Sequence, residues 1–231
     1  MDKMIVYEDD FLLVVHKPVG IATETARIGQ ADLVSELKNY RKKKGEDTYV
    51  GVVHRLDQPV EGLLVFAKDG ETANKLSDEL QNGTLTKRYV VLTSGVPQTS
   101  EGELTDYLLK DGRTNLSRVV PEGEKGAKKA ALFWKLLQHD GAVSLLEIEL
   151  YTGRHHQIRV QMSHAGMSLL GDYKYADAQI VRISEQMRVK EVALCACQLS
   201  FRHPRTGKRM DFKIRPEGKI FQTEEFEPYY P

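Results

Sequence analysis

The chain has 231 residues, of which 41% are hydrophobic, and this is enough to bury a core in one domain or two small ones. Lysine plus arginine and aspartate plus glutamate each number 33, so the formal net charge is zero. This balance excludes a protein that holds nucleic acid by its overall electrostatic field, and any RNA must be bound by local basic patches. No stretch reaches the ~18 apolar residues of a membrane span, and the N-terminus lacks the basic and apolar segments of a secretory signal. We therefore expect a cytoplasmic protein that does not bind membranes.

The N-terminal part of the chain carries signals for short strands and one helix. Asp9-Asp10 forms a turn between two β-rich segments. Asp32 is a suitable N-cap for a helix, because the apolar side chains that follow it have helical spacing and Gly45 lies past their end. The expected strands of this part are residues 6–7, 12–15, 49–53 and 62–67.

The remainder of the chain alternates a second helix with further strands. This helix begins at Asp69 and ends near Asn82-Gly83. Residues 97–129 are rich in glycine and charge, and we expect surface hairpins and loops there. Residues 154–166 fit both a strand and a helix, and periodicity alone does not decide between them. The expected strands are residues 89–93, 130–137, 143–150, 192–201 and 210–214.

This order of elements predicts an α+β fold with a mostly antiparallel sheet, because many connections are too short for parallel crossovers. We expect a single domain over residues 1–231. Cys195 and Cys197 are too close in sequence for a relaxed disulfide, so we expect small buried thiols in a reducing compartment.

The stretch His54-Arg55-Leu56-Asp57 concentrates three ionisable side chains after a hydrophobic strand and before a proline turn. Rigid scaffolds often present reactive groups at such a strand end. The Asp57 carboxylate is a candidate nucleophile, general base or metal ligand. The alternative from spacing alone is an aspartate that caps a turn and forms a salt bridge.

A second group of polar residues spans positions 152–159, where Arg154 and Arg159 offer planar cationic side chains. An arginine near Asp57 would keep that carboxylate ionised. Tyr89 follows Lys87-Arg88 and is a candidate platform for stacking an RNA base, with an ordinary core tyrosine as the alternative.

Taken together, these segments resemble the RluA family of pseudouridine synthases from about residue 6 to residue 216. The resemblance rests on several motifs in a shared order: Lys17-Pro18-Val19-Gly20, His54-Arg55-Leu56-Asp57 with residues 62–68, Lys87-Arg88-Tyr89, residues 152–159 with Gly171-Asp172, and residues 203–207.

The resemblance implies roles for individual residues and a pseudouridine synthase fold, with flanking helices and a central active-site cleft. Asp57 would be the catalytic aspartate, Tyr89 would stack on the target base and Arg159 would pair with the aspartate. The resemblance also favours a helix from about His156, which would place His155 and Arg159 one turn apart on one face. The residues expected to bind the substrate are His54, Arg55, Lys87, Arg154 and His155.

The chain departs from the family pattern at several positions. Val60-Glu61 stand where a threonine-serine pair is common, while Gln161 and Cys195 each replace a frequent histidine. We expect no N-terminal S4 domain, which is optional in the family. These departures concern the identity of the substrate more than the type of reaction.

The function implied is the isomerisation of specific uridines to pseudouridine in structured RNA, either ribosomal or transfer RNA, and not in DNA. The reaction needs no cofactor and no metal, and we expect a monomer. Three routes for the aspartate remain open: attack on C1′, addition to C6 and removal of a ribose proton. The competing hypotheses are a non-catalytic RNA-binding relative and a metal-dependent hydrolase that uses His155, His156 and His164, although these histidines match no tight zinc signature.

Overall fold

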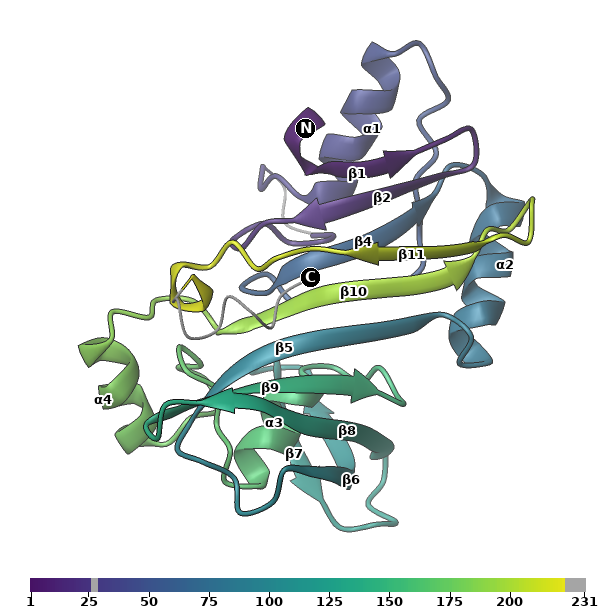
Figure 1. Cartoon of the computed structure of the whole chain (residues 1–231). Coiled ribbons are helices and arrows are strands. Elements are labelled where there is room, and N and C mark those ends of the chain that lie inside the picture. Colours follow the sequence, from purple (N-terminus) through teal and green to yellow (C-terminus); the bar gives the residue numbers. More distant parts are fainter. Residues whose placement is uncertain (26–28, 223–231) are drawn as a thin grey trace. The chain divides into compact units, whose positions relative to one another are not determined.

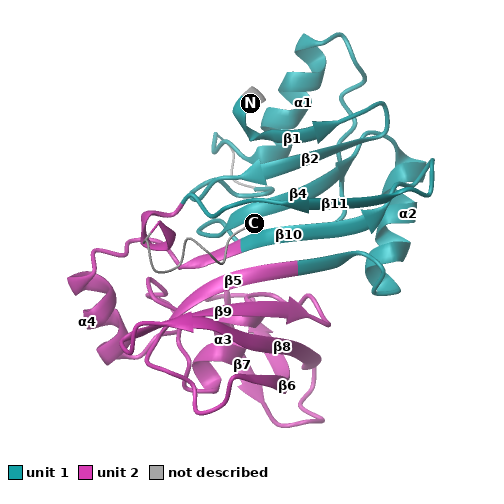
Figure 2. Cartoon of the chain, in the orientation of Figure 1, with its two compact units in different colours: residues 1–87, 196–217, 231 teal, residues 88–195, 218–230 magenta. Residues whose placement is uncertain are grey.

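A computed structural model of the chain describes residues 1–25 and 29–222. The described residues divide into two compact units (Figure 2). Unit 1 holds residues 1–87 and 196–217, and unit 2 holds residues 88–195 together with the described part of 218–230. The single catalytic domain expected from the sequence stays a prediction, and the two units are described in turn.

The described part of unit 1 combines a β-sheet with two α-helices and one 3-10 helix (Figure 1). Its strands are ordered β1-β2-β4-β10, with β11 beside β10 and β3 beside β4. The β1–β2, β2–β4, β3–β4 and β10–β11 pairs are antiparallel. The elements in chain order are the 3-10 helix η1 (Asp2–Met4), β1 (Ile5–Glu8), β2 (Leu12–Lys17), α1 (Leu33–Lys43), β3 (Gly51–Val52), β4 (Glu61–Ala67), α2 (Gly70–Gln81), most of β10 (Leu194–Arg202) and β11 (Arg209–Lys213).

Both helices of unit 1 begin where the sequence predicts. The Asp32 carboxylate accepts a hydrogen bond from the Ser35 N–H at 2.8 Å and caps α1. The Asp69 carboxylate accepts from the Thr72 N–H at 2.8 Å and caps α2 in the same way. Each cap satisfies a backbone donor that the first helical turn leaves unpaired. Because this requirement is local, the two helix starts were predictable from the sequence.

The core of unit 1 is built around β4, whose seven residues are all buried. Leu63 and Val65 pack with Leu76 of α2 and with apolar side chains of β2 and β10. Burying each such side chain stabilises the fold by about 1.5–3 kcal/mol. The apolar run predicted as a strand is therefore a strand without a solvent face, which explains why it does not alternate.

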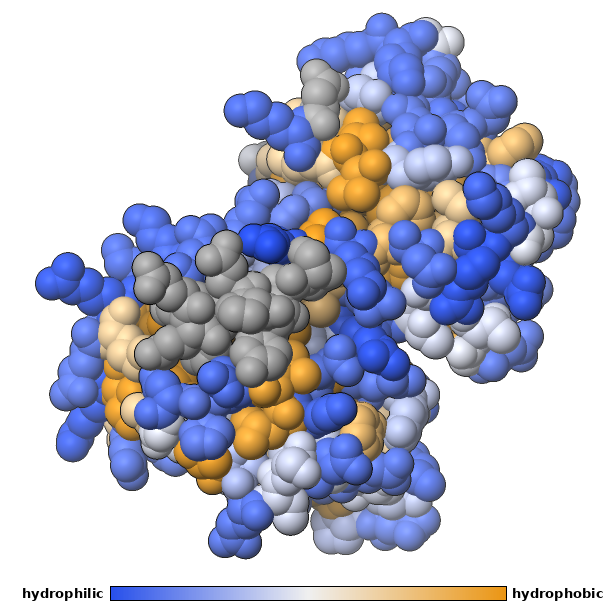
Figure 3. Space-filling model, in the orientation of Figure 1, coloured by the Kyte–Doolittle hydropathy of each residue, from blue (hydrophilic) through white to orange (hydrophobic). Residues whose placement is uncertain are grey.

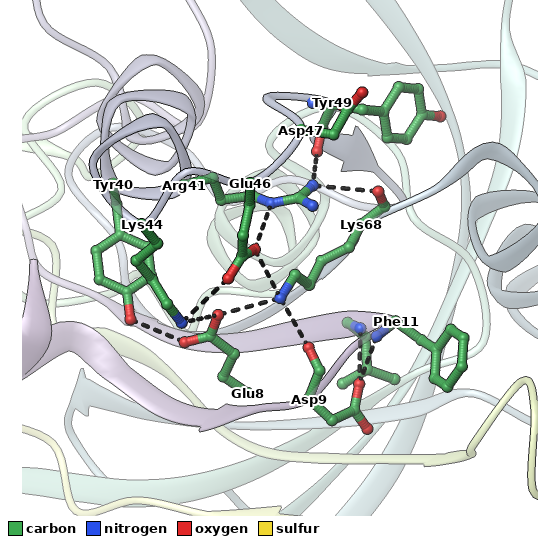
Figure 4. Close-up of polar contacts among 11 residues, drawn as sticks. Glu8, Asp9, Phe11, Tyr40, Arg41, Lys44, Glu46, Asp47, Tyr49 and Lys68 are labelled. Atoms are coloured by element: carbon green, nitrogen blue, oxygen red, sulfur yellow. Dashed lines mark hydrogen bonds and ion pairs between the residues drawn. The ribbon is translucent and has the colours of Figure 1, made fainter.

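A network of charged side chains fastens α1 to the sheet of unit 1 (Figure 4). The Lys68 ammonium lies 2.9 Å from the Glu46 carboxylate and 3.1 Å from that of Glu8. Arg41, the buried cation of α1, pairs with Glu46 at 3.2 Å and donates to the Lys68 carbonyl at 3.1 Å. The hydrogen bond from Lys68 lowers the pKa of Glu46 to about 2, so this carboxylate stays ionised down to acidic pH.

The strands of unit 2 are ordered β5-β9-β8-β6-β7, and each neighbouring pair is antiparallel. The expected pair of strands around Asp140-Gly141 is confirmed as β8 and β9. The elements are β5 (Thr86–Ser94), β6 (Glu101–Asp111), β7 (Leu116–Val120), β8 (Lys128–His139), β9 (Val143–Leu150), α3 (Gln157–His164), α4 (Ala178–Gln186) and the 3-10 helix η2 (Lys219–Phe221).

The segment 97–129 is more regular than the sequence suggests. The hairpin is confirmed, since β6 and β7 pair antiparallel. The expectation of loops is wrong for β6, which runs for 11 residues and pairs with β8 from Glu101 to Leu108. This strand alternates between exposed and half-buried residues, so it lacks the apolar run that marks a buried strand.

Residues 157–164 form the helix α3, which resolves the ambiguity of this segment. His156 precedes the helix in a left-handed conformation, with φ of 54°. The Gln157 side chain holds the turn before the helix, because its Oε1 accepts from the Arg154 N–H at 2.9 Å and from the Thr152 hydroxyl at 2.8 Å. The sequence missed α4, although Asp177 caps it by accepting from two backbone N–H groups.

Hydrophilic residues cover most of the face shown in Figure 3. None of the helices described for residues 1–25 and 29–222 has the length and apolar character to cross a membrane. Cys195 and Cys197 are buried, as the sequence predicts.

Candidate active site

Asp57 lies in unit 1, in the loop that joins β3 to β4, and its side chain is half-buried. The loop turns back at Gln58 and Pro59, where the Val60 N–H donates to the Asp57 carbonyl at 3.0 Å. The proline turn predicted from the sequence therefore directly follows the candidate aspartate.

The residue before Asp57 is held by Thr23. The Thr23 hydroxyl donates to the Leu56 carbonyl at 3.0 Å and accepts from the Leu56 N–H at 3.2 Å. Both residues are buried, so the two hydrogen bonds form away from solvent. One side chain thus fixes both polar groups of the Leu56 backbone.

The residue after Asp57 is held by the Lys17-to-Gly20 motif. Gly20 exchanges two hydrogen bonds with Gln58, one from its own N–H and one from the Gln58 side-chain amide, both at 2.9 Å. The Lys17 ammonium also donates to the Gln58 carbonyl at 3.3 Å. Two motifs about 40 positions apart in the sequence therefore meet at the backbone of the residue that follows Asp57.

Lys17 is fully buried, and its three donor hydrogens all have carbonyl acceptors. The carbonyls of Pro18 and Ile21 lie 2.9 Å and 2.8 Å from its nitrogen, in addition to that of Gln58. Burial lowers the pKa of Lys17 to about 8, while the negative charges of Asp57 and Glu61 act in the opposite direction. The ammonium is therefore still mostly protonated at neutral pH and supplies positive charge close to Asp57.

His54 is buried beneath this loop. Its Nε2 accepts a hydrogen bond from the Val65 N–H at 3.3 Å. Burial, and then the charge of Lys87, hold the pKa of His54 well below its usual range, so the ring is neutral. Burial also lowers the pKa of Lys87 to about 8. The structure places His54 in the core of unit 1, and the roles of His54 and Lys87 in binding the substrate stay predictions.

Arg55 differs from its neighbours because its side chain is 71% exposed. Its guanidinium lies 3.7 Å from the Glu24 carboxylate, which is also exposed. An exposed ion pair of this kind contributes little to stability. Because its side chain is exposed, Arg55 is accessible to a phosphate group. Its role in holding RNA stays a prediction.

Arg159 lies in unit 2, on α3, and is almost completely buried. Its Nε and one terminal nitrogen donate to the two carboxylate oxygens of Asp172, at 2.8 Å and 2.7 Å. Its guanidinium also lies over the Tyr175 ring, 5.1 Å from the centroid. This bidentate arrangement fixes the plane of the guanidinium. The expected pairing of Arg159 with Asp57 stays a prediction.

Gly171 explains how Asp172 reaches this position. Its φ is +71°, and a Cβ atom there would lie 2.0 Å from the Glu191 carbonyl oxygen. Only glycine fits such a close approach in a left-handed conformation. The Gly171-Asp172 pair is therefore a unit in which the glycine allows the turn and the aspartate orients Arg159.

Tyr89 is a buried residue of β5 that lies opposite Ile148 of β9. Its stacking on a base stays a prediction. Arg154 is exposed and donates from Nε to the Lys129 carbonyl at 2.9 Å, and the His155 Nδ1 lies 2.9 Å from the Ser117 hydroxyl. Their binding of the substrate also stays a prediction.

One prediction for His155 is wrong. This residue does not share a helical face with Arg159, because α3 begins at Gln157 and the backbone reverses into the left-handed region at His156. His155 instead stacks on the His156 ring, with the two centroids 3.7 Å apart.

The three histidines of the metal hypothesis have separate partners. His155 contacts Ser117, His156 Nδ1 lies 2.6 Å from the Tyr175 hydroxyl, and His164 pairs with Asp106 at 3.2 Å. Burial and then the charge of Arg159 lower the pKa of His156 to about 3. Within the described part of the chain, these histidines do not form a group that could hold a metal ion.

Comparison with known proteins decides the family. The family model for RNA pseudouridylate synthase matches residues 11–164, which is more than half of the chain. The chain belongs to the RluA family of pseudouridine synthases. The match includes Lys17, Asp57, Tyr89 and Arg159, so the family assignment covers all three proposed catalytic residues.

Several bacterial members of the family are similar to the chain. Ribosomal large subunit pseudouridine synthase C of Buchnera aphidicola is 30% identical over 207 residues, which are 89% of this chain and 65% of the relative. Ribosomal large subunit pseudouridine synthase D of Zymomonas mobilis is 33% identical over 90% of this chain and 67% of the relative. The uncharacterized RNA pseudouridine synthase YlyB of Bacillus subtilis is 32% identical over 92% and 69%. The chain thus spans about two thirds of the length of these curated relatives.

Solved structures confirm the expected fold class. Human RNA pseudouridylate synthase domain containing 4 superposes with a TM-score of 0.79 at 21% identity, over 98% of this chain and 94% of that one. Human RNA pseudouridylate synthase domain containing 1 gives a TM-score of 0.73 at 23% identity, over 98% and 86%. At these identities the likeness shows the α+β pseudouridine synthase fold alone.

The departures from the RluA pattern occupy buried positions. Gln161 of α3 is buried and donates to the Asp106 carboxylate at 2.8 Å, so an amide fills a site in the protein interior. Cys195 is a buried thiol of β10, and Glu61 is a buried carboxylate at the start of β4.

The residues that hold the Asp57 loop and the Arg159 side chain in place were not predictable from the sequence. Thr23 lies in a segment with no recognised motif, and nothing local identifies Leu56 as its partner. Asp172 stood inside a recognised motif, but its ion pair with Arg159 requires the three-dimensional fold. Tyr175, which contacts both Arg159 and His156, had no signal in the sequence.

Proposed function

We propose that this protein converts specific uridines of ribosomal large-subunit RNA to pseudouridine, with Asp57 as the catalytic carboxylate. The observation that carries the proposal is the way the Asp57 backbone is held. Thr23 fixes the residue before it and Lys17 with Gly20 fixes the residue after it, while the side chain stays half-buried. A carboxylate held in this manner is positioned for chemistry on a bound nucleoside.

The reaction is an isomerisation. The bond from uracil N1 to ribose C1′ breaks, a bond from C5 to C1′ forms, N1 gains a proton and C5 loses its hydrogen as a proton. Asp57 acts as the ionised carboxylate of this sequence, and Lys17 supplies nearby positive charge. The target base must first leave its stack at a cost of a few kcal/mol, and stacking on Tyr89 would return ~1–3 kcal/mol.

Several observations support ribosomal RNA as the substrate. Relatives over most of this chain are named ribosomal large subunit pseudouridine synthases C and D. The zero net charge requires local basic residues, and Arg55, Lys87 and Arg154 are the proposed contacts. Action on transfer RNA, the exclusion of DNA, the monomeric state and the cytoplasmic location stay predictions.

A deletion strain tests the function directly. Pseudouridines in large-subunit RNA are mapped in the parent, in the deletion strain, and in deletion strains that express the wild type, Asp57→Asn or Asp47→Asn. The deletion is expected to lose at least one site, which the wild type and the exposed-surface control Asp47→Asn restore and Asp57→Asn does not. An unchanged map in the deletion strain contradicts ribosomal RNA as the substrate, and restoration by Asp57→Asn contradicts the role of Asp57.

A further inference from the structure

Unit 1 contains a second group of ionisable side chains, apart from the Asp57 loop. His16 lies on β2, Glu61 begins β4, and Glu217 follows β11. One ligand atom can be chosen from each side chain so that all three atoms lie within 4.8 Å of one another. The three side chains are 13%, 4% and 72% exposed, so the group reaches from the protein interior to the surface.

The imidazole of His16 lies between the two carboxylates. Its Nε2 is 3.7 Å from the Glu61 carboxylate, and its Nδ1 is 3.7 Å from that of Glu217. Among the residues that the structure describes, the buried Nε2 atom has no hydrogen-bond partner. A buried ring nitrogen without a hydrogen bond is costly, and such an atom beside a carboxylate is a position where a cation would be bound.

The distances suit a small transition-metal ion. Bonds of about 2.1 Å to nitrogen and oxygen in a tetrahedral site place neighbouring ligand atoms about 3.4 Å apart. One ion can bind only one nitrogen of an imidazole ring. The 3.7 Å from the His16 Nε2 to the Glu61 carboxylate therefore needs little change, and one ligand atom of Glu217 can be chosen within 4.8 Å of those of the other two residues. One imidazole with two carboxylates suits zinc or manganese better than magnesium or calcium, which prefer ligand sets made of oxygen.

We propose that His16, Glu61 and Glu217 form a binding site for a divalent transition-metal ion, with zinc as the best fit. The two carboxylates offset the charge of the ion, and Lys17 beside them directs its ammonium to three carbonyl oxygens instead. The ion would join β2, β4 and the segment after β11. Glu217 is already close to this position, because its N–H donates to the Glu61 carboxylate at 3.0 Å.

The site has a structural role and is independent of the chemistry of Asp57. It lies at the start of β4, directly after the loop that carries the aspartate, and Glu61 is one of the departures from the family pattern. An ion bound there would stabilise the folded chain, since a ligand that binds only the folded state shifts the unfolding equilibrium.

Zinc titration of the full chain without a histidine tag tests the proposal. Isothermal titration calorimetry with Zn²⁺ is expected to show one saturable equivalent for the wild type. His16→Gln and Glu217→Gln are each expected to weaken binding at least ~10-fold. Thermal unfolding provides a second readout, because Zn²⁺ should raise the unfolding temperature of the wild type and leave that of either variant nearly unchanged.

Matched variants keep the test decisive. Glu124→Gln removes an exposed glutamate and His164→Gln removes an exposed histidine outside the group, and both are expected to bind zinc as the wild type does. Glu217→Gln changes a mostly exposed side chain, so it should fold even where changes at the buried Glu61 do not. The proposal is overturned if the wild type shows no saturable binding, or if His16→Gln and Glu217→Gln retain the wild-type affinity.

Discussion

The Asp57 loop and the Arg159 end of α3 hold their charged residues in two different ways. Around Asp57 the fixed atoms belong to the backbone, since Thr23, Lys17 and Gly20 bind the main chain of the residues on either side. Around Arg159 the fixed atoms belong to the side chain, which Asp172 holds through two charged hydrogen bonds.

The difference suggests distinct tasks for the two regions. A loop held through its backbone fixes the position from which the Asp57 side chain extends. A guanidinium held by a bidentate carboxylate keeps a fixed plane and a balanced charge in a buried environment. Removing a partner of Arg159 should therefore mainly lower the stability of the folded chain. Removing a partner of the Asp57 loop should lower turnover more than its effect on stability explains.

The largest effect on stability is expected for Asp172→Ala. This change leaves the buried Arg159 guanidinium without its two charged hydrogen bonds, and breaking a buried pair in this way costs about 3–5 kcal/mol. Urea unfolding measures it. The control Glu147→Ala breaks a more exposed pair with Arg88 in the same unit and should cost less than about 1 kcal/mol. Equal losses in the two variants would show that the buried pair of Arg159 and Asp172 contributes no more to stability than an exposed pair does.

A smaller effect with a defined pH dependence is expected for Lys17→Met. The pKa of Lys17 is about 8 in the folded chain and 10.5 in a model compound, so between these values the unfolded chain binds more protons. The stability of the wild type relative to Lys17→Met should therefore rise with pH, by about 2 kcal/mol from pH 7 to pH 9.5.

Urea unfolding of both proteins across this pH range measures the difference. The exposed Lys38 provides the control, and Lys38→Met should run parallel to the wild type at every pH. A stability difference between wild type and Lys17→Met that stays constant or falls as the pH rises would show that burial does not lower the pKa of Lys17.

The smallest effect on stability is expected for Thr23→Val, which removes both hydrogen bonds to the Leu56 backbone and keeps the shape of the side chain. We expect a loss of about 1–2 kcal/mol. Turnover on RNA should fall several-fold at a temperature where the variant is fully folded, because the Asp57 backbone loses its support on one side. Thr84→Val, which removes an exposed hydroxyl bond to a backbone carbonyl, should leave turnover unchanged.

The parts of the fold that were predictable from the sequence depend on local signals. Asp32 and Asp69 cap their helices through residues three positions away, and β4 is a continuous apolar run. The extent of β6 within the expected hairpins was not predictable, because one of its faces is polar, and α4 was missed although Asp177 caps it.

The candidate site shows the same limit. Asp57, Tyr89 and Arg159 were identified from motif order, but the partners that hold them lie far away in the sequence. Thr23 meets Leu56 across 33 positions and Lys17 meets Gln58 across 41, and no local pattern encodes such pairs. The position of His155 was predicted incorrectly because His156 adopts a left-handed conformation. Such a conformation is uncommon for residues other than glycine, so the sequence does not indicate it.

The role of Asp57 is tested most directly by tritium release from large-subunit RNA that carries uridine labelled at C5, with purified wild type, Asp57→Asn and the control Asp47→Asn. We predict that Asp57→Asn folds and binds this RNA as the wild type does, while its tritium release falls to the level of the reaction without enzyme. Release at the wild-type rate by Asp57→Asn would contradict the assignment of the catalytic carboxylate.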